Sequence, residues 1–436
     1  MCAALASRYF CHVRSRRPGP RAGGRHTLTE YASRVAVYCP DLGGGVAQIA
    51  LAQIDILLAA GYPVDLLIQQ ACGHYSERIP ERVRVVPLAP ADEATTRACR
   101  DRALRGHPIM RFRSRFVSAN RLTELSYVPA LVDYLERERP ALLLANVWSS
   151  VLIAGYARAC IDYPPRLIGL FHGTFFAEAV QRRSARRHPL RWRHFFALCR
   201  SFYSRADALI TVSDGVGRDL VRIVGVAAHR VETLSNPVVS AALIERAAEP
   251  VTHPWFEDVA PLVVAVGRLS PEKNYRLLIE AFAHLRAARA DVRLAILGEG
   301  QERVALEALR DELGLSECVT LPGWVDNPHA WMARASLLTL SSDWEGLPTV
   351  LIEAMACGCP VVATDCMHGP REIVDHGRYG RLVPVGDVQA FARAMAETID
   401  APHASDLLRT RAEHYSIAAA TQRYRALVAR VLAMQE

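Results

Sequence analysis

Lysine is nearly absent from this chain of 436 residues: it occurs once, at Lys273, and the other 51 of the 52 lysine and arginine residues are arginines. The eleven cysteines contain no C-x-x-C spacing, which excludes the common zinc knuckles. Their odd number and wide scatter do not indicate a disulfide framework either. The cysteine usage therefore fits a reducing compartment best.

The sequence also lacks the composition of a disordered or fibrous chain. Charged residues make up only 22%, glycine and proline number 26 and 25, and 51% of the residues are hydrophobic. Such a chain can bury large cores, and its length suits two domains of roughly 150 to 200 residues each.

No apolar run is a convincing membrane span. Residues 141–157 are uncharged and approach the roughly 20 residues that a transmembrane helix needs. However, a short β-like run over residues 141–144 is followed by Asn146, Trp148 and two serines before a helical pattern begins. This order predicts a buried strand, a loop and a helix rather than a span.

Charge is divided unevenly along the chain. Residues 1–240 carry 33 basic and 19 acidic side chains (net +14), whereas residues 241–436 carry 19 and 26 (net −7), which together give +7. The first half therefore faces something anionic: a phosphate-bearing acceptor, a membrane surface or nucleic acid. Residues 1–30 are basic without an apolar segment, and we interpret them as a disordered arm or the product of a misassigned start codon.

Two clusters concentrate the positive charge. Residues 182–200 hold seven arginines interleaved with Trp192, Phe195 and Phe196, and a smaller cluster lies at residues 111–116. The first is typical of a basic amphipathic helix at a lipid interface, helical at least after Pro189. A solvated helix face explains it equally well.

Short β-branched runs alternate with helical segments over residues 34–240, and the rhythm restarts after residues 250–261. This pattern predicts two doubly wound parallel α/β sheets joined by a linker. Their strands are expected at residues 35–38, 64–68, 83–86, 141–144, 167–171, 208–212, 262–266, 294–297, 337–340 and 361–363. Ligands of such sheets bind beyond the carboxyl ends of the strands, so two facing sheets would enclose a cleft.

The only lysine lies in a predicted anion site. The strand at residues 263–266 leads into Gly267, Arg268 and, five residues later, Lys273, just before a helix from about Tyr275. Two cations and the free N–H groups of a helix N-terminus favour an anion, and a diphosphate fits best.

A pair of carboxylates follows a later strand. Glu345 precedes Gly346, Leu347 and a proline on a loop, and Glu353 lies in the next helix. Carboxylates accept charge-assisted hydrogen bonds from vicinal diols. With a diphosphate nearby, the pair could hold the sugar and the ribose of a nucleotide-sugar.

Together these motifs resemble the large retaining glycosyltransferase family marked by E-x7-E, family 4 type or group 1, which has the GT-B fold of two Rossmann-like domains facing a cleft. The resemblance extends over about 380 residues, from Gly43-Gly44-Gly45 to Gly369-Pro370-Arg371-Glu372. It implies an acceptor domain at residues 31–245, a nucleotide-sugar domain at 246–415 and a C-terminal helix at 416–436 that packs back on the first domain.

The resemblance also implies roles for single residues. Arg268 and Lys273 would bind the donor diphosphate, Glu345 the sugar hydroxyls and Glu353 the ribose, with Gly298, Glu299, Gly346 and Leu347 as further substrate-binding residues. In the first domain it marks the glycine loop Gly43, Gly44 and Gly45, where a missing Cβ lets a ligand approach. His172, at a strand end, would hydrogen-bond a sugar hydroxyl or position the transferred group.

The expected reaction moves a hexose or N-acetylhexosamine, most often from a UDP-sugar, with retained configuration, to a glycan or lipid-linked acceptor in cell-surface polysaccharide or glycolipid synthesis. No D-x-D sequence is present, so we expect no metal and no other cofactor. We expect a cytoplasmic protein, with an anionic membrane surface as a candidate partner and no nucleic acid. A UDP-sugar epimerase of the same architecture and a non-catalytic assembly subunit at the membrane surface remain the alternatives.

Overall fold

Two compact units make up the chain in the computed structural model, which describes residues 34–70, 75–117, 123–174, 189–257 and 260–434. The first unit consists of two segments of the chain, one that ends at Leu234 and one that begins at Thr421. The second unit is the segment between them, Ser235–Ala420. The second unit therefore begins ahead of the expected boundary at residue 245. The basic arm at residues 1–30 and the arginines at 182–187 lie outside the described residues.

The first unit is built on a seven-stranded parallel sheet, in the order β3-β2-β1-β4-β5-β6-β7. Its strands are β1 (Val35–Tyr38), β2 (Val64–Ile68), β3 (Arg84–Pro87), β4 (Leu142–Asn146), β5 (Arg166–Phe171), β6 (Ala208–Thr211) and β7 (Val231–Thr233). Its helices are α3 (Gly45–Ala59), α4 (Glu93–Ala103), α5 (Pro108–Ser114), α7 (Val128–Glu138), α8 (Trp148–Arg158), α10 (Pro189–Tyr203) and α11 (Asp214–Asp219).

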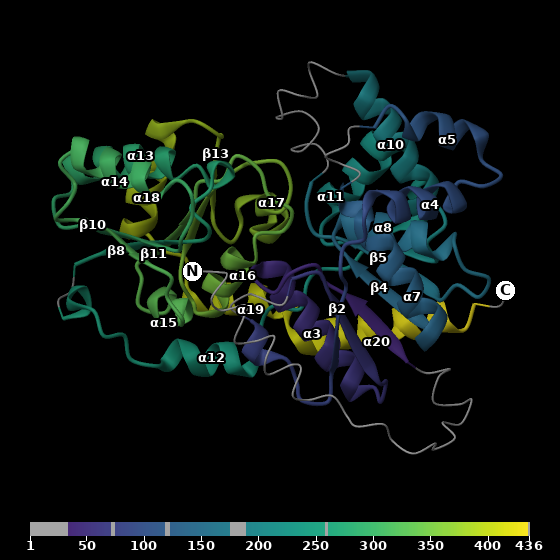
Figure 1. Ribbon diagram of the computed structural model, residues 1–436. Helices are drawn as coiled ribbons and strands as arrows, with labels where there is room; N and C mark the ends of the chain where they lie inside the picture. The colour runs from purple at the N-terminus through teal and green to yellow at the C-terminus, as the bar shows by residue number, and fades with distance from the viewer. Residues whose placement is uncertain (1–33, 71–74, 118–122, 175–188, 258–259, 435–436) are drawn as a thin grey trace. The chain divides into compact units, whose positions relative to one another are not determined.

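The C-terminal helix α20 (Ile417–Leu432) contributes to this first unit. Tyr424 accepts a hydrogen bond from the buried Gln53 of α3 at 3.2 Å, and Arg425 donates to the backbone carbonyl of Ala59 at 3.1 Å. The helix therefore packs along α3, a contact between segments that are far apart in the sequence (Figure 1).

The second unit has a six-stranded parallel sheet, in the order β10-β9-β8-β11-β12-β13. Its strands are β8 (Leu262–Val266), β9 (Arg293–Leu297), β10 (Val319–Gly323), β11 (Leu337–Leu340), β12 (Val361–Thr364) and β13 (Arg381–Val383). Its helices are α12 (Ala241–Ala248), α13 (Tyr275–Ala288), α14 (Arg303–Glu312), α15 (Pro328–Met332), α16 (Thr349–Ala356), α17 (Pro370–Ile373), α18 (Val388–Asp400) and α19 (Ser405–Ala412).

Helices cover both faces of the second sheet (Figure 1). Leu278, Phe282 and Phe391 of α13 and α18 pack against one face, and Trp331 of α15 packs against the other. A parallel strand enclosed in this way is buried on both sides, which is why β8 is a continuous apolar run and why β9 and β11 contain only one polar residue each, Arg293 and Thr339. The predicted α/β class with two doubly wound sheets is confirmed.

Residues 141–157 form β4, a short turn and α8, as predicted. None of the helices that the structure describes is both long and apolar enough to cross a bilayer. Residues 189–203 are helical (α10), as predicted for the stretch after Pro189, but the expectation that the aromatic residues of this helix face a lipid surface is wrong for two of them. Trp192 and Phe195 are buried at 8% and 2% exposure, because α10 packs on α8 and the Phe195 ring meets Trp148 edge to face.

Candidate active site

The predicted diphosphate loop and the predicted carboxylate loop leave neighbouring strands of the second sheet. Strand β8 leads to Arg268 and Lys273, and β11 leads to Glu345. The two strands are hydrogen-bonded neighbours, and the order of the sheet reverses between them. Their carboxyl ends therefore form the switch point at which sheets of this kind bind ligands.

Lys273 and Glu345 meet at this switch point. The Nζ atom of Lys273 lies 2.6 Å from Oε1 of Glu345, and the side chains are only 21% and 12% exposed. The Ser342 hydroxyl donates a second hydrogen bond to the same oxygen, at 2.7 Å. The carboxylate is therefore held from two sides, and Ser342 is a contact that the sequence analysis did not foresee.

Further hydrogen bonds tie the two loops together. Asn274 accepts from the backbone N–H of Leu277 and so caps α13, while its Nδ2 donates to Asp343 at 2.8 Å. The Ser341 hydroxyl donates to the backbone carbonyl of Lys273 at 2.8 Å. Burial raises the pKa of Asp343, and the bond from Asn274 opposes that shift. The loops are thus fixed to each other through their backbones as well as through the ion pair.

The second carboxylate, Glu353, has a different partner. It lies on α16 with its side chain 11% exposed, and its Oε2 is 3.4 Å from Nε2 of His329 on α15. The other ring nitrogen of His329 is buried without a hydrogen-bond partner among the described residues. His329 could not be predicted from the sequence, because one histidine in a short helix has no spacing that points to a carboxylate on another helix.

Arg268 and Glu299, two further residues of the predicted donor site, differ in their ion-pair partners. Arg268 is exposed and has no ion-pair partner within the described part of the chain. Glu299 instead forms two hydrogen bonds with Arg303, at 2.7 and 2.9 Å. Arg268 is therefore available to an anion as the structure stands, whereas a ligand would share the Glu299 carboxylate with Arg303.

Gly298 and Gly369 lie where a larger residue would collide with neighbouring parts of the protein. Gly298 ends β9 at φ +144°, and a Cβ there would lie 2.0 Å from the carbonyl oxygen of Gly267 at the end of β8. Gly369, at φ +85°, approaches the loop at Gly346 and Leu347 so closely that a Cβ would lie 2.5 Å from Pro348. Gly298 thus lets two strand ends come together, and Gly369 supports the carboxylate loop from outside.

The first unit carries the glycine loop between β1 and α3. Asp41 accepts from the backbone N–H of Gly43 at 2.9 Å, Gly44 is the residue before the helix, and Gly45 begins it. None of the three has a positive φ, and a Cβ on Gly45 would meet nothing within 4 Å. Packing inside the protein therefore does not require glycine at Gly45, and the open space suits a ligand.

His172 follows β5 and contacts Asn146, the last residue of the adjacent strand β4. Its Nε2 lies 2.9 Å from Oδ1 of Asn146, which is fully buried. An amide oxygen only accepts, so the ring proton is on Nε2 and the buried Nδ1, which has no partner among the described residues, is an acceptor. Burial lowers the pKa of His172 to about 4, so the imidazole is neutral near pH 7.

This pKa predicts how the stability depends on pH. Unfolding returns the pKa of His172 to about 6.5, so between about pH 4 and pH 6.5 the unfolded chain binds more protons and the folded state loses stability as the pH falls. We expect the melting temperature of the wild type to drop more between about pH 7 and pH 4.5 than that of His172→Gln. The exposed His229→Gln is the control, and equal pH dependence of all three proteins would contradict the assignment.

Comparison with known families covers most of both units. Residues 43–241 match the family model described as Glycosyltransferase Family 4, and residues 260–401 match the one described as Glycosyl transferases group 1. The chain is 34% identical over 198 residues to the N-acetylgalactosamine-N,N'-diacetylbacillosaminyl-diphospho-undecaprenol 4-alpha-N-acetylgalactosaminyltransferase of Campylobacter jejuni, covering 45% of this chain and 52% of that protein. It is 28% identical to the lipopolysaccharide 1,6-galactosyltransferase of Salmonella typhimurium, covering 50% and 60%. The chain thus spans little more than half the length of these relatives.

Solved structures share the fold. Anabaena HepE in complex with UDP superposes with a TM-score of 0.68 at 18% identity, covering 91% of this chain and 100% of that one. The sucrose-phosphate synthase of Thermosynechococcus elongatus gives a TM-score of 0.70 at 21% identity, covering 92% and 99%. At this identity the likeness establishes the two-domain architecture and no more.

Proposed function

Because this chain belongs to the glycosyltransferases, with a family 4 domain followed by a group 1 domain, we propose that it transfers a hexose or N-acetylhexosamine from a UDP-sugar to a glycan or lipid-linked acceptor, with retained configuration. The observation that carries the proposal is the contact between Lys273 and Glu345 at the switch point of the second sheet. The cation that we assign to the diphosphate and the carboxylate that we assign to the sugar lie there 2.6 Å apart.

In the proposed complex the donor replaces this ion pair. The diphosphate takes the ammonium of Lys273 and the exposed guanidinium of Arg268, which frees Glu345 to accept hydrogen bonds from the sugar hydroxyls. Ser342 keeps its bond to Glu345 and holds the carboxylate in place during the exchange. Glu353, steadied by His329, accepts from the ribose hydroxyls.

The proposed chemistry needs no protein nucleophile. The bond between the anomeric carbon and the diphosphate breaks as the acceptor oxygen bonds to the same face of that carbon, and the acceptor proton passes to a departing phosphate oxygen. The products are the glycoside and UDP. Lys273 and Arg268 stabilise the negative charge that develops on the leaving diphosphate. His172 is neutral and its acceptor Nδ1 is buried, so in the proposal it takes a hydrogen bond from a sugar hydroxyl once ligand binding opens access to that nitrogen.

The acceptor and the location are the finer part of the proposal. The names of several relatives refer to lipopolysaccharide, and one names a diphospho-undecaprenol acceptor, which supports a lipid-linked glycan as the substrate. All eight cysteines that the structure describes are free, which supports a reducing compartment such as the cytoplasm. We place the reaction at the cytoplasmic face of a membrane.

A panel of nucleotide-sugars tests the function directly. Each donor is incubated with the protein, with and without an extract of lipid-linked glycans, and the thermal shift and the release of nucleoside diphosphate are measured. At least one UDP-sugar should stabilise the protein and release UDP faster when acceptor is present. Conversion of the donor without any acceptor would support an epimerase, and donor binding without turnover would support an assembly subunit.

Removal of the only lysine should weaken binding of the nucleotide itself. The ammonium of Lys273 contacts the diphosphate in donor and product alike, so Lys273→Gln should raise the Kd of both the UDP-sugar and free UDP about tenfold or more in calorimetry. Arg276→Gln, an exposed cation three residues further on, is the matched control and should bind both ligands as the wild type does. Equal affinity of Lys273→Gln and wild type for UDP would remove Lys273 from the phosphate site.

A further inference from the structure

Helices α5 and α10 together form a surface that neither forms alone. Helix α5 packs against α10 (Figure 1). The Phe116 ring, just after α5, stacks on the His194 imidazole of α10 with centroids 5.0 Å apart. The Phe112 ring meets Phe116 edge to face at 4.9 Å. The basic cluster at residues 111–116 and the described part of the cluster at 182–200, residues 189–200, therefore lie side by side.

Large apolar side chains project from this surface into solvent. Ile109, Phe112, Phe116 and Leu190, which we call the α5–α10 ridge, are 66%, 57%, 44% and 67% exposed. Phe112 and Phe116 are the only exposed phenylalanines among the residues that the structure describes. Soluble proteins seldom expose apolar groups in this way unless the surface meets a partner or a membrane.

Unneutralised positive charge surrounds the ridge. Arg113, Arg115, Arg191 and Arg193 form no ion pair within the described ranges, and residues 102–123 contain no acidic residue. Arg111 has one partner, Asp101, at 3.9 Å.

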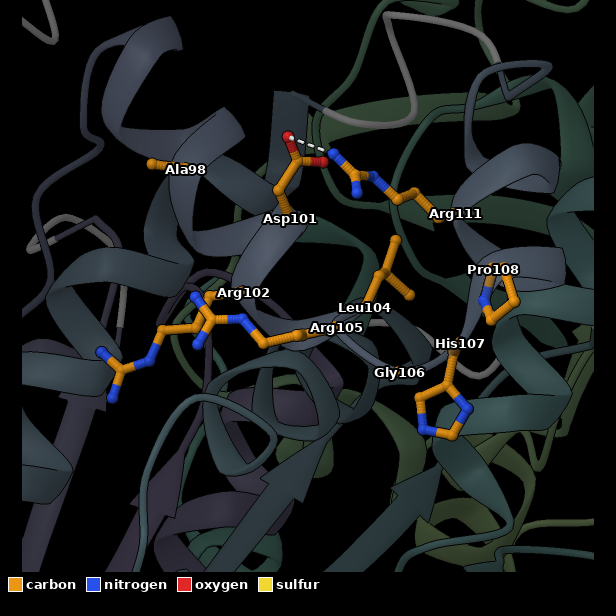
Figure 2. Close-up of a pocket in the computed structure, with 9 residues that line it drawn as sticks. All are labelled: Ala98, Asp101, Arg102, Leu104, Arg105, Gly106, His107, Pro108 and Arg111. Atoms are coloured by element: carbon orange, nitrogen blue, oxygen red, sulfur yellow. Dashed lines mark ion pairs between the residues drawn. The ribbon is translucent and has the colours of Figure 1, made fainter.

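A cavity of about 350 Å³ at the foot of α5 extends the same charge. Arg102, Arg105 and Arg111 line it with Asp101 as the one acid, and Figure 2 shows Arg111 reaching toward Asp101 while Arg102 and Arg105 extend the other way. Arg102 also lies 3.8 Å from Glu136, and three guanidiniums against two carboxylates leave this region cationic.

We propose that the α5–α10 ridge docks on an anionic lipid bilayer. Ile109, Phe112, Phe116 and Leu190 enter the boundary between headgroups and acyl chains, and the flanking arginines bind lipid phosphates. The charge of the surface favours a bilayer over other partners. The arginines around the ridge complement anionic headgroups, and the apolar ridge complements the acyl layer beneath them. The proposal rests on the proposed function, because it names the surface that would bring the enzyme to an acceptor carried by a lipid.

Vesicle binding tests the proposal without donor or acceptor, so its result is independent of the transfer reaction. The full chain should sediment with vesicles that contain about 30% phosphatidylglycerol, less so when salt rises from about 50 to 500 mM, and should not sediment with pure phosphatidylcholine. The double variant Phe112→Ser/Phe116→Ser should lower the partition coefficient at least about tenfold. Ile244→Ser/Val304→Ser, exposed at 48% and 77% in the second unit, should bind as the wild type does.

A second pair of variants tests the contribution of the arginines. Arg113→Gln/Arg115→Gln should weaken binding and reduce its salt dependence, whereas the control Arg276→Gln/Arg310→Gln should not. Inorganic phosphate at millimolar concentration should not release the protein, which separates a bilayer surface from a site for free phosphate. Circular dichroism and an unchanged Kd for UDP show that each variant is folded.

Three results would overturn the proposal. The first is no sedimentation with anionic vesicles at low salt, and the second is equal binding by ridge and control variants. The third combines two measurements: the wild type is dimeric and the ridge variant monomeric in sedimentation velocity, and both bind vesicles equally well. That result would make the ridge an interface between copies of the chain.

Discussion

Replacing Glu345 with glutamine should lower the rate of sugar transfer about 100-fold and leave the protein folded. Glutamine keeps the size of the side chain but loses the charge that strengthens hydrogen bonds from the sugar hydroxyls. It also loses the ion pair with Lys273. Because Glu345 lies on a loop and is not part of the apolar core, the melting temperature should change little. The affinity for free UDP should stay the same or rise, because UDP binding no longer has to break the ion pair between Lys273 and Glu345.

This combination of results distinguishes a substrate contact from a structural one. Steady-state kinetics and calorimetry with UDP give the two readouts, and Glu280→Gln, a surface carboxylate on α13 paired with Arg276, serves as the control. Transfer at the wild-type rate in a folded Glu345→Gln protein would contradict the assignment of Glu345. Loss of the fold would instead assign the ion pair to stability.

Substituting alanine for Gly298 should destabilise the second unit by about 3 kcal/mol or more. A Cβ at this position would overlap the backbone carbonyl oxygen of Gly267, and the two glycines directly follow neighbouring strands, so neither can move without its strand. The backbone N–H of Gly298 also donates to the carbonyl of Gly323 on the far side. The strands β8 and β9 would therefore have to separate where the diphosphate loop begins, and donor affinity should fall together with stability.

Thermal and urea denaturation measure this effect, and a loss of this size corresponds to about 6 to 12 °C in Tm for a domain of the size of the second unit. Gly314 supplies the control: it also has a positive φ, +68°, but a Cβ there would meet nothing within 4 Å. Gly314→Ala should cost about 1 kcal/mol from the backbone alone. Equal losses in the two variants would show that φ, and not the contact with Gly267, sets the requirement for glycine.

Every interior strand of the two sheets was predicted, and the strands that were missed lie at the edges. Of the four edge strands, only β3 was predicted. The apolar runs at residues 35–38, 262–266 and 337–340 match β1, β8 and β11, which are buried on both faces. The missed strands β7, β10 and β13 are edge strands of their sheets, where one side has no strand neighbour. Polar residues such as Glu232 and Arg381 are tolerated there, so the apolar pattern disappears from the sequence.

The candidate site could be predicted in part for a similar reason. Lys273 and Glu345 are 72 positions apart, but each follows a recognisable strand, so the rule for parallel sheets brings them to one edge. Asn146, Ser342 and His329 were missed because their roles depend on contacts between side chains, and no spacing marks such contacts. The buried aromatics of α10 show the opposite failure: the pattern of charge and rings predicted a helix at a lipid surface, but Trp192 and Phe195 are buried inside the protein, where α10 packs on α8.

The sole lysine also provides the most direct measurement. With the ε-amine of lysine labelled with ¹⁵N, the NMR spectrum contains one side-chain ammonium signal, that of Lys273. The signal should shift in Glu345→Gln, because the ion pair is lost, and in the wild type it should shift on addition of UDP, because the diphosphate takes over the ammonium. A signal that neither Glu345→Gln nor saturating UDP displaces would contradict a shared site for the cation, the carboxylate and the nucleotide.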